Sequence, residues 1–412
     1  MMNYKVGISI GLLKVKFLGV FILILCNPIF IWPVLKIIGP LFALFFLGLI
    51  FIRGRVSAKK LLLALFIFQI LILYKYLQGA SYFGVLYFSF VVALIVLVQN
   101  DTLIESFLVF KYILSIVVGF GIFVWLIHLL AGNSYHLFMG YLPDEYVLNQ
   151  LKVETGARYG LYPLSTRIVY DSLAGFYRFQ SVFDEPGYLG TVSALVIAAS
   201  RGSLKEWTNK VIFLGGVLSL SLAFYILMFL YYILFFLKEP VKFIKVSVFV
   251  FLLAFSISFS PLGQFIIENY LVDRIAFEDG DLAGNNRSND YLNDSFDYFF
   301  SEASFQEMLF GLPHFEGKGS SSIKQIPVTV GFAGVSIIIL MYLMLAGSYL
   351  SRPSFYSAIF ILIYFISAFQ RPSIADPVYL FIFIAGLLYS ETRKLPRRND
   401  FSGGIGSDGS LV

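Results

Sequence analysis

The chain of 412 residues is long enough for two or three ordinary domains, but 58% of its residues are hydrophobic and only 13% are charged. With 46 Phe, 26 Tyr and a mean hydropathy of +0.83, apolar side chains outnumber the positions that a water-soluble globule could bury. This composition excludes a soluble enzyme and predicts that the lipid bilayer is the main solvent. The net charge of +5 does not indicate a nucleic-acid partner, because the basic residues form short clusters between apolar runs.

Apolar runs of bilayer length recur along the chain. A spanning helix needs about 20 mostly apolar residues, and fewer where it is distorted or packed inside a bundle. We therefore predict an all-α fold in which residues 1–412 form a single integral membrane domain of about 11–12 transmembrane helices. The predicted spans are 17–32, 34–52, 61–77, 82–98, 108–131, 187–200, 211–222, 223–237, 246–260, 328–350, 354–369 and 373–390. The single cysteine, Cys26, lies inside an apolar run, which excludes an intramolecular disulfide and a cysteine-ligated metal centre.

Two long polar segments, 132–186 and 261–326, interrupt the series of spans, and a polar tail follows at 391–412. Short loops rich in lysine and arginine stay in the cytoplasm, so the basic clusters predict the orientation of the chain. The clusters are Lys5, Lys14 and Lys16; Arg53, Arg55, Lys59 and Lys60; Arg201, Lys205 and Lys210; Lys238, Lys242 and Lys245; Arg352; and Arg393, Lys394, Arg397 and Arg398.

All these clusters face the cytoplasm together only if the stretch 211–237 crosses the membrane twice, as two short helices with Ser219 and Ser221 at the bend. The sequence then predicts that both termini and the tail are cytoplasmic and that both long segments are extracytoplasmic loops. If the stretch crosses only once, the two loops fall on opposite faces of the membrane.

The two predicted loops are acidic, since 6 Asp and Glu lie in 132–186 and 11 in 261–326, of 25 in the whole chain. Arginines within such a face either pair locally with acids or hold a diphosphate near the membrane through paired N–H donors. The arginines of this face are Arg158, Arg167, Arg178, Arg274 and Arg287.

A charged segment leads from the first loop into a predicted span. It contains Arg178 and ends in an acidic pair whose second member, Glu185, precedes Pro186, a favoured first residue of a helix. One interpretation is that the carboxylates cap the helix N-terminus, whose N–H groups favour anions. The alternative is that Glu185 is a general base for an acceptor hydroxyl, with Arg178 close enough to bind the leaving group. Gly187 and Gly190 are small enough to let another helix or a lipid chain approach.

The second loop carries an amphipathic pattern between Arg287 and Gly311. It predicts one helix lying on the outer leaflet or over the bundle mouth, ended by Gly311-Leu-Pro313. This helix could also cover the bundle without touching a substrate. The apolar positions at helical spacing are Leu292, Phe296, Phe299, Ala303 and Met308.

The three histidines, His128, His136 and His314, are not spaced like metal ligands, so no metal site is predicted. No Walker-type glycine loop or dinucleotide fingerprint is present, and no cofactor is predicted. His314 could act as an acid or base because the unperturbed pKa of histidine is near neutral, although a surface histidine in a loop is the simpler interpretation.

Together these features resemble the bacterial O-antigen polymerases of the Wzy type and, more distantly, the O-antigen ligases. The resemblance covers most of the chain. It rests on the many spans, the two long loops, the segment from Arg178 to Gly190, and the order of Leu309-Phe-Gly311 before Gly331-Phe-Ala-Gly334.

The resemblance implies a metal-independent glycosyltransferase of the bacterial inner membrane. It would polymerise undecaprenyl-diphosphate-linked repeat units into O-antigen or a related surface polysaccharide at the periplasmic face, and a chain-length regulator protein would be a further partner. Glu185 would be the base, and arginines would stabilise the departing diphosphate. The residues that would bind the diphosphate and glycan are Arg178 and Arg287, with Arg158, Arg167 and His314 as further contacts.

Two other functions stay open from the sequence. An O-antigen ligase would transfer finished glycan to lipid A-core instead of extending it. A lipid-linked oligosaccharide flippase would also have many spans and cationic contacts to a diphosphate lipid. Flippases usually have two comparable halves, however, and this chain has no visible internal repeat.

Overall fold

The computed structural model describes most of the helical part of the chain. The described residues are 2–26, 32–51, 56–77, 81–131, 140–141, 158–162, 165–169, 178–183, 185–237, 277–278, 281–282, 290–312, 322–350, 352–370 and 375–392, with the isolated positions 241, 244, 248, 259, 264 and 315.

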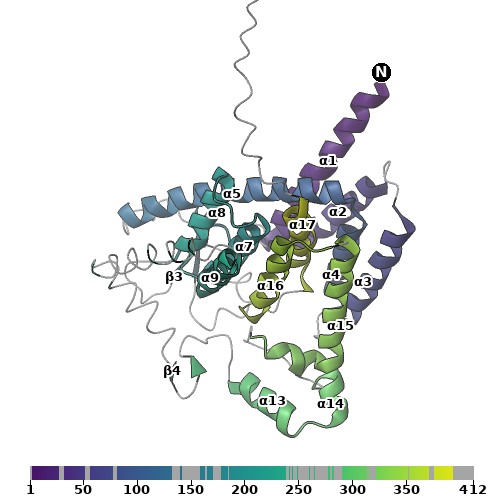
Figure 1. The fold of residues 1–412 in the computed structure, drawn as a ribbon, viewed down its shortest axis with the longest axis vertical. Coiled ribbons are helices and arrows are strands. Elements are labelled where there is room, and N and C mark those ends of the chain that lie inside the picture. Colours follow the sequence, from purple (N-terminus) through teal and green to yellow (C-terminus); the bar gives the residue numbers. More distant parts are fainter. Residues whose placement is uncertain are drawn as a thin grey trace, which may run out of the picture.

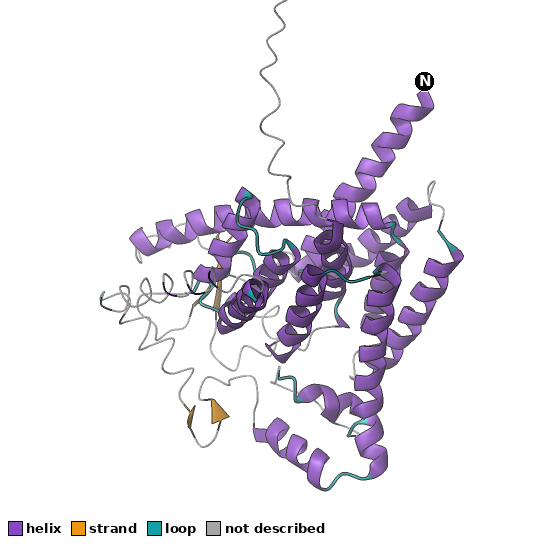
Figure 2. Ribbon diagram, in the orientation of Figure 1, coloured by secondary structure: helices purple, strands orange, loops and turns teal. Residues whose placement is uncertain are grey.

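Helices account for most of the described residues, as Figures 1 and 2 show. They are α1 (Met2–Leu25), α2 (Trp32–Phe51), α3 (Ala58–Leu77), α4 (Tyr82–Leu97), α5 (Asn100–Ala131), α7 (Pro186–Ala199), α8 (Trp207–Leu218), α9 (Leu222–Phe236), α13 (Asp290–Ser301), α14 (Phe305–Phe310), α15 (Gln325–Tyr349), α16 (Phe355–Gln370) and α17 (Pro377–Thr392). Local sequence explains several of the starts. The Ser81 hydroxyl accepts a hydrogen bond from the Gly84 N–H and caps α4, and prolines open α7 and α17.

The predicted spans largely coincide with these helices. Eleven of the twelve overlap a helix, and the span predicted at 246–260 lies almost wholly outside the described residues. The first predicted span, 17–32, is set too late, since α1 ends at Leu25 and α2 begins at Trp32.

Short strands lie within both predicted loops, a feature that the all-α prediction did not include. Aromatic and β-branched residues favour extended backbone there, and pairing satisfies the backbone N–H and C=O groups. The strands β1 (Gly140–Tyr141), β2 (Arg158–Tyr162) and β3 (Ser165–Val169) form an antiparallel sheet in that order, and β4 (Phe277–Glu278) pairs with β5 (Asp281–Leu282). None of the described strands exceeds five residues, so the described chain remains helical in class.

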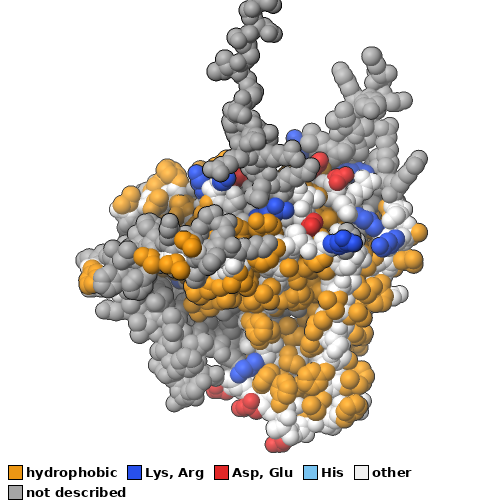
Figure 3. Space-filling model, in the orientation of Figure 1, with side chains coloured by type: hydrophobic (Ala, Val, Ile, Leu, Met, Phe, Trp, Pro, Cys, Tyr) orange, Lys and Arg blue, Asp and Glu red, His pale blue; other side chains and the backbone are white. Residues whose placement is uncertain are grey.

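Among the described residues, three helices are long and apolar enough to cross a membrane: α3, the part of α5 from Asn100 to Ile127, and α15. Large apolar side chains are exposed on them, for example Leu62 (67%), Phe123 (59%) and Leu343 (61%). Figure 3 shows a broad band of hydrophobic side chains between a charged upper edge and an acidic lower end, where α13 lies in Figure 1. Because water disfavours such a band and lipid accommodates it, the chain is a membrane protein.

Lysine and arginine contacts gather at one end of the bundle, which we name the basic end after Lys60, Lys111 and Arg201. Lys60 Nζ donates to a carbonyl at the end of α4 and to Asn100 Oδ1 at the start of α5. Lys111 Nζ is buried and lies 2.5 Å from Glu206 Oε2, just before α8. Arg201 donates to two carbonyls at the end of α17. These bonds bring the starts of α3, α5 and α8 to the same end of the bundle as the ends of α4, α7 and α17.

The helices α8 and α9 run in opposite directions along α7. At the end away from the basic end, Gly190 of α7 lies so close to Ser219 and Ser221 that a Cβ at this position would overlap the Ser221 side chain. At the basic end, the Tyr232 hydroxyl of α9 donates to the Gly202 carbonyl, just after α7. The predicted bend at Ser219 and Ser221 is therefore confirmed. With 14, 12 and 15 residues, α7, α8 and α9 are shorter than the roughly 20 residues of a full span.

The amphipathic segment of the second loop forms two helices instead of the single one predicted. Its apolar face is confirmed for α13, which buries Leu292 and Phe299 against Val328 of α15. A second N-terminus interrupts the pattern, because Ser304 and Glu307 form a capping box that starts α14. Hydrogen bonds from the Ser304 N–H and hydroxyl hold the pKa of Glu307 below its ordinary value.

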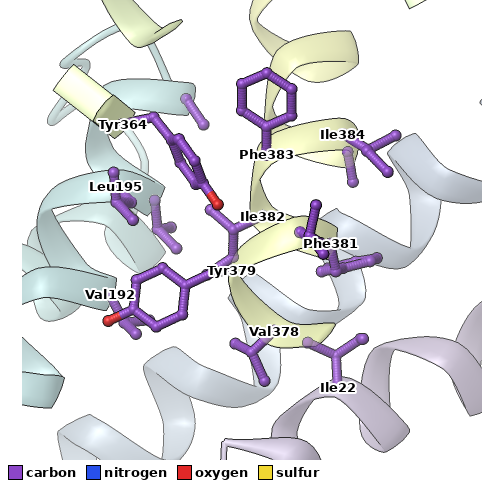
Figure 4. Packing of buried hydrophobic residues seen from close by; sticks show 14 of the residues in the cluster. Ile22, Val192, Leu195, Tyr364, Val378, Tyr379, Phe381, Ile382, Phe383 and Ile384 are labelled. Atoms are coloured by element: carbon purple, nitrogen blue, oxygen red, sulfur yellow. The ribbon is translucent and has the colours of Figure 1, made fainter. Parts of the chain in front are cut away.

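The core of the bundle is built around α17, in which nearly every side chain is buried. Figure 4 shows Tyr379 and Ile382 of α17 beside Val192 and Leu195 of α7, with Phe383 facing Tyr364 of α16. A helix that is apolar on all sides packs in the middle of a bundle. From this central position, α17 contacts the helices on which the candidate site lies.

Candidate functional site

The turn that leads into α7 is held against neighbouring helices by buried aromatic residues. The Phe179 N–H donates to the Leu218 carbonyl at 3.2 Å, and the Phe179 ring meets Trp125 of α5 edge-on. Phe183 is also fully buried. Between them, Ser181 has a φ of 53°, an uncommon value for a residue other than glycine. The packing fixes this turn, and with it the side chains that precede and follow it.

Arg178 sits at the start of this turn and contacts the bend between α8 and α9. Its Nε donates to the Ser219 carbonyl at 3.0 Å, and Ser219 is the C-terminal cap of α8. A cation at this place is favourable, because the last carbonyls of a helix lack partners within it and carry partial negative charge. Arg178 also interacts electrostatically with Tyr225 of α9. The side chain is partly exposed, so the contact orients its guanidinium without burying it.

Glu185 follows the turn as the N-terminal cap residue of α7. Its carbonyl accepts hydrogen bonds from the N–H groups of Tyr188 and Leu189, which starts the helix at Pro186 as predicted. Its side chain makes no capping hydrogen bond to the described first turn of α7. Of the two interpretations drawn from the sequence, side-chain capping by Glu185 is therefore not found. The residue is partly exposed and lies on the same side of the bundle as Arg178.

The two glycine segments singled out by the resemblance are in contact. Gly331 interrupts α15 with φ 62° and ψ −177°, and a Cβ there would overlap the Leu309 carbonyl and the Gly311 nitrogen. The Leu312 N–H donates to the Val328 carbonyl at 2.8 Å. The end of α14 thus lies backbone to backbone against an opened turn of α15. Gly311, with φ 92°, ends α14 as predicted.

One carboxylate of interest was missed by the sequence analysis. Asp376, just before α17, forms an ion pair with Lys75 of α3 at 2.8 Å, and their side chains are 37% and 13% exposed. One turn into α17, the ring of Tyr379 meets that of Tyr188 of α7 edge-on, with centroids 6.2 Å apart. A local signal was available, because Asp376-Pro-Val-Tyr repeats the acid-Pro-x-Tyr pattern of Glu185-Pro-Gly-Tyr. We name the end of the bundle that carries Arg178, Glu185 and Asp376 the loop end.

Two further predicted contacts fall on the strands of the first loop. Arg158 pairs with Val169 and Gly160 with Arg167, so Arg158 and Arg167 occupy diagonal positions on one face of the β2–β3 hairpin. The structure thereby brings these two positions together, on a hairpin whose β3 contacts α5. The predicted contacts Arg287 and His314 lie outside the described residues.

Asp184, Arg274 and His136 are likewise outside the described residues, as is the predicted tail from 393 onward. Within the described part of the chain, no three His, Cys, Asp and Glu side chains come together in a group that could hold a metal ion. Comparisons with models of protein families, with curated proteins and with solved structures find no match for this chain.

Proposed function

We propose that this chain is a glycosyltransferase of the bacterial inner membrane that polymerises undecaprenyl-diphosphate-linked repeat units into O-antigen or a related surface polysaccharide. The observation that carries the proposal is the fixed turn between Arg178 and Glu185. It presents a cation and a carboxylate from one short segment at the loop end, and the carboxylate does not cap its own helix. Glycosyl transfer from a lipid diphosphate needs these two groups, one to bind the leaving group and one to activate the acceptor.

In the proposed reaction, Glu185 accepts the proton of an acceptor sugar hydroxyl. The hydroxyl oxygen then forms a bond to the anomeric carbon of the donor, and the bond from that carbon to the lipid diphosphate breaks. The Arg178 guanidinium stabilises the negative charge that develops on the departing diphosphate. Because Arg178 Nε is bonded to the Ser219 carbonyl, the plane of the guanidinium is set before the substrate arrives. Arg158, Arg167, Arg287 and His314 are further proposed contacts to the diphosphate and glycan.

The proposed enzyme has 11–12 spans, cytoplasmic termini and two extracytoplasmic loops, with α8 and α9 crossing as a pair of short helices. The contacts at the two ends of α7 support this arrangement. Lys60 and Arg201, which belong to the basic clusters, make their contacts at the basic end, as residues of cytoplasmic loops do. The described acidic residues of α13 lie beyond the start of α15, at the loop end.

The test uses purified protein with lipid-linked repeat units extracted from a host that lacks the gene for this chain. A chelator is present throughout, because the proposed reaction needs no metal. The wild-type protein is expected to produce a ladder of lengthening chains. Arg178→Ala should remove the ladder, and Arg178→Lys should restore it poorly because lysine lacks the bidentate donor pair.

The matched control is Arg352→Ala, an exposed arginine at the basic end, which should polymerise at the wild-type rate. A normal ladder from Arg178→Ala would remove this residue from the site. Loss of wild-type activity with the chelator would overturn the metal-free reaction. Transfer of preformed glycan to lipid A-core, without chain growth, would identify a ligase instead.

A further inference from the structure

Two helices at the loop end begin in the same way and lie side by side. Glu185 and Asp376 each accept the first hydrogen bonds of a helix through the backbone carbonyl, each precedes a proline, and each lies three residues before a tyrosine. Residues three apart share one face of a helix. The rings of Tyr188 and Tyr379 meet, and each acidic residue precedes its tyrosine by three residues at the start of its helix.

The contacts further along show that α7 and α17 run parallel to each other. Gly386 of α17 packs against Ala199 of α7, and Arg201 then donates to the Ser390 carbonyl at 2.7 Å. Both helices therefore run from the loop end to the basic end. Glu185 and Asp376 thus precede the starts of two parallel helices that contact each other.

A contribution to the stability of the fold does not explain the ion pair of Asp376 with Lys75 well. Lys75 is largely buried at the end of a helix that is apolar enough to span a membrane, and it lies against the Phe88 ring. Removing an ammonium from water is costly, and apolar replacements of buried ion pairs are often neutral or stabilising. Ionisable groups kept at such places usually serve a substrate. Asp376 is the more exposed partner, and the ion pair engages one of its two carboxylate oxygens.

We infer that Asp376, held in place by Lys75, binds hydroxyl groups of the acceptor sugar beside Glu185. This inference rests on the proposed function. A carboxylate only accepts hydrogen bonds, which suits the donor O–H groups of a sugar. Lys75 offsets the charge of Asp376, so a second carboxylate next to Glu185 does not repel the lipid-linked substrate. Asp376 thereby orients the hydroxyl whose proton Glu185 accepts.

Buried tyrosines pack in the core next to Asp376, and a residue that positions a substrate needs such a closely packed surrounding. The tyrosines Tyr74, Tyr342 and Tyr364 are fully buried, and their hydroxyls are close enough to Asp376 to interact with its charge. The Tyr342 and Tyr364 hydroxyls are also hydrogen-bonded to each other at 2.7 Å.

The test separates an ion pair that only joins two helices from one that binds substrate. The wild type and the variants receive saturating lipid-linked donor and increasing amounts of the same repeat-unit oligosaccharide freed from its lipid. The exchanged variant Lys75→Asp with Asp376→Lys keeps the ion pair but moves the carboxylate to α3. We expect it to melt near the wild-type temperature and to raise the KM for the free oligosaccharide by at least about tenfold, as loss of a hydrogen bond to a charged group does.

The apolar variant Lys75→Met with Asp376→Leu provides a second folded reference and should show the same defect. Asp294→Asn, an exposed carboxylate on α13, is the matched control and should leave the KM unchanged. A wild-type KM in the exchanged or the apolar variant would show that the pair only joins α3 to α17, and the inference would fail while the proposed function stands. A wild-type protein that makes no polymer would remove the proposed function and this inference together.

Discussion

Arg178 and Glu185 lie on one short turn but relate to the fold in different ways. Arg178 has a structural contact, because its Nε holds the end of α8. The Glu185 side chain contributes no capping bond to the described start of α7, where the backbone and Pro186 already define the helix. Replacing Arg178 therefore removes a bond to the end of α8 as well as a proposed catalytic group, whereas replacing Glu185 leaves the backbone start of α7 in place.

This difference leads to a prediction for Glu185→Gln. The free energy of unfolding should change by no more than about 1.5 kcal/mol, the upper net contribution of one ordinary hydrogen bond, because glutamine keeps the shape of glutamate and the backbone and Pro186 define the start of α7. The rate of polymerisation should fall about 10²- to 10⁴-fold, which is the usual contribution of a general base. The rate of Glu185→Asp should lie between those of the wild type and Glu185→Gln, because the shorter side chain displaces the carboxylate. Circular dichroism melting and the chain-growth assay measure the two effects separately. Near-normal growth by Glu185→Gln would mean that the base lies elsewhere.

At the scale of elements, the junction of α14 with α15 depends on two glycines in left-handed backbone. Gly331→Ala should destabilise the protein by about 1–3 kcal/mol from backbone strain alone, with overlap against the Leu309 carbonyl adding to it. Gly347→Ala is the matched control, because it lies in the same helix with open space around it and should be neutral or slightly stabilising. Thermal melting in detergent measures both. If Gly331→Ala and Gly347→Ala melted at the same temperature, the close backbone contact between α14 and α15 at Gly331 would be contradicted.

Local signals predicted the elements better than their contacts. The start of α7 at Pro186 and the bend at Ser219 and Ser221 follow from proline and serine positions within a few residues. The break between α13 and α14 was also marked locally, by Ser304 and Glu307, but the apolar spacing across it indicated one helix.

The candidate site was predictable only in part, because its bonds join distant parts of the chain. Arg178 and Glu185 could be selected from their place before a helix. The bond from Arg178 to Ser219 and the pair of Lys75 with Asp376 depend on how separate helices pack, which no local pattern specifies. Conversely, the repeated acid-Pro-x-Tyr pattern was visible, but its meaning depends on the contact between Tyr188 and Tyr379.

At the scale of the whole molecule, one end of the bundle is basic and the other is acidic, as expected if the basic end faces the cytoplasm. Lysines and arginines join six helix termini at the basic end, and the acidic face of α13 lies at the loop end. The antiparallel arrangement of α8 and α9 is what allows the chain to return to the basic end after α9. If the stretch 211–237 crossed the membrane only once, the acidic face of α13 would lie on the same side of the membrane as Lys60, Lys111 and Arg201.

Cysteine labelling in spheroplasts tests this orientation with four single-cysteine proteins in a Cys26→Ala background. Because α8 and α9 return the chain to the basic end, an impermeant maleimide should label Ser134→Cys in the first loop and Asp294→Cys on α13 without permeabilisation. Lys205→Cys, before α8, and Leu237→Cys, after α9, should react only once the membrane is opened; both positions are exposed, so lack of labelling would not reflect burial. If the stretch instead crossed once, Leu237→Cys would be labelled from outside and Asp294→Cys would be protected. That reversed pair of results would contradict the double crossing and would put Arg287 on the opposite side of the membrane from Arg178 and Glu185.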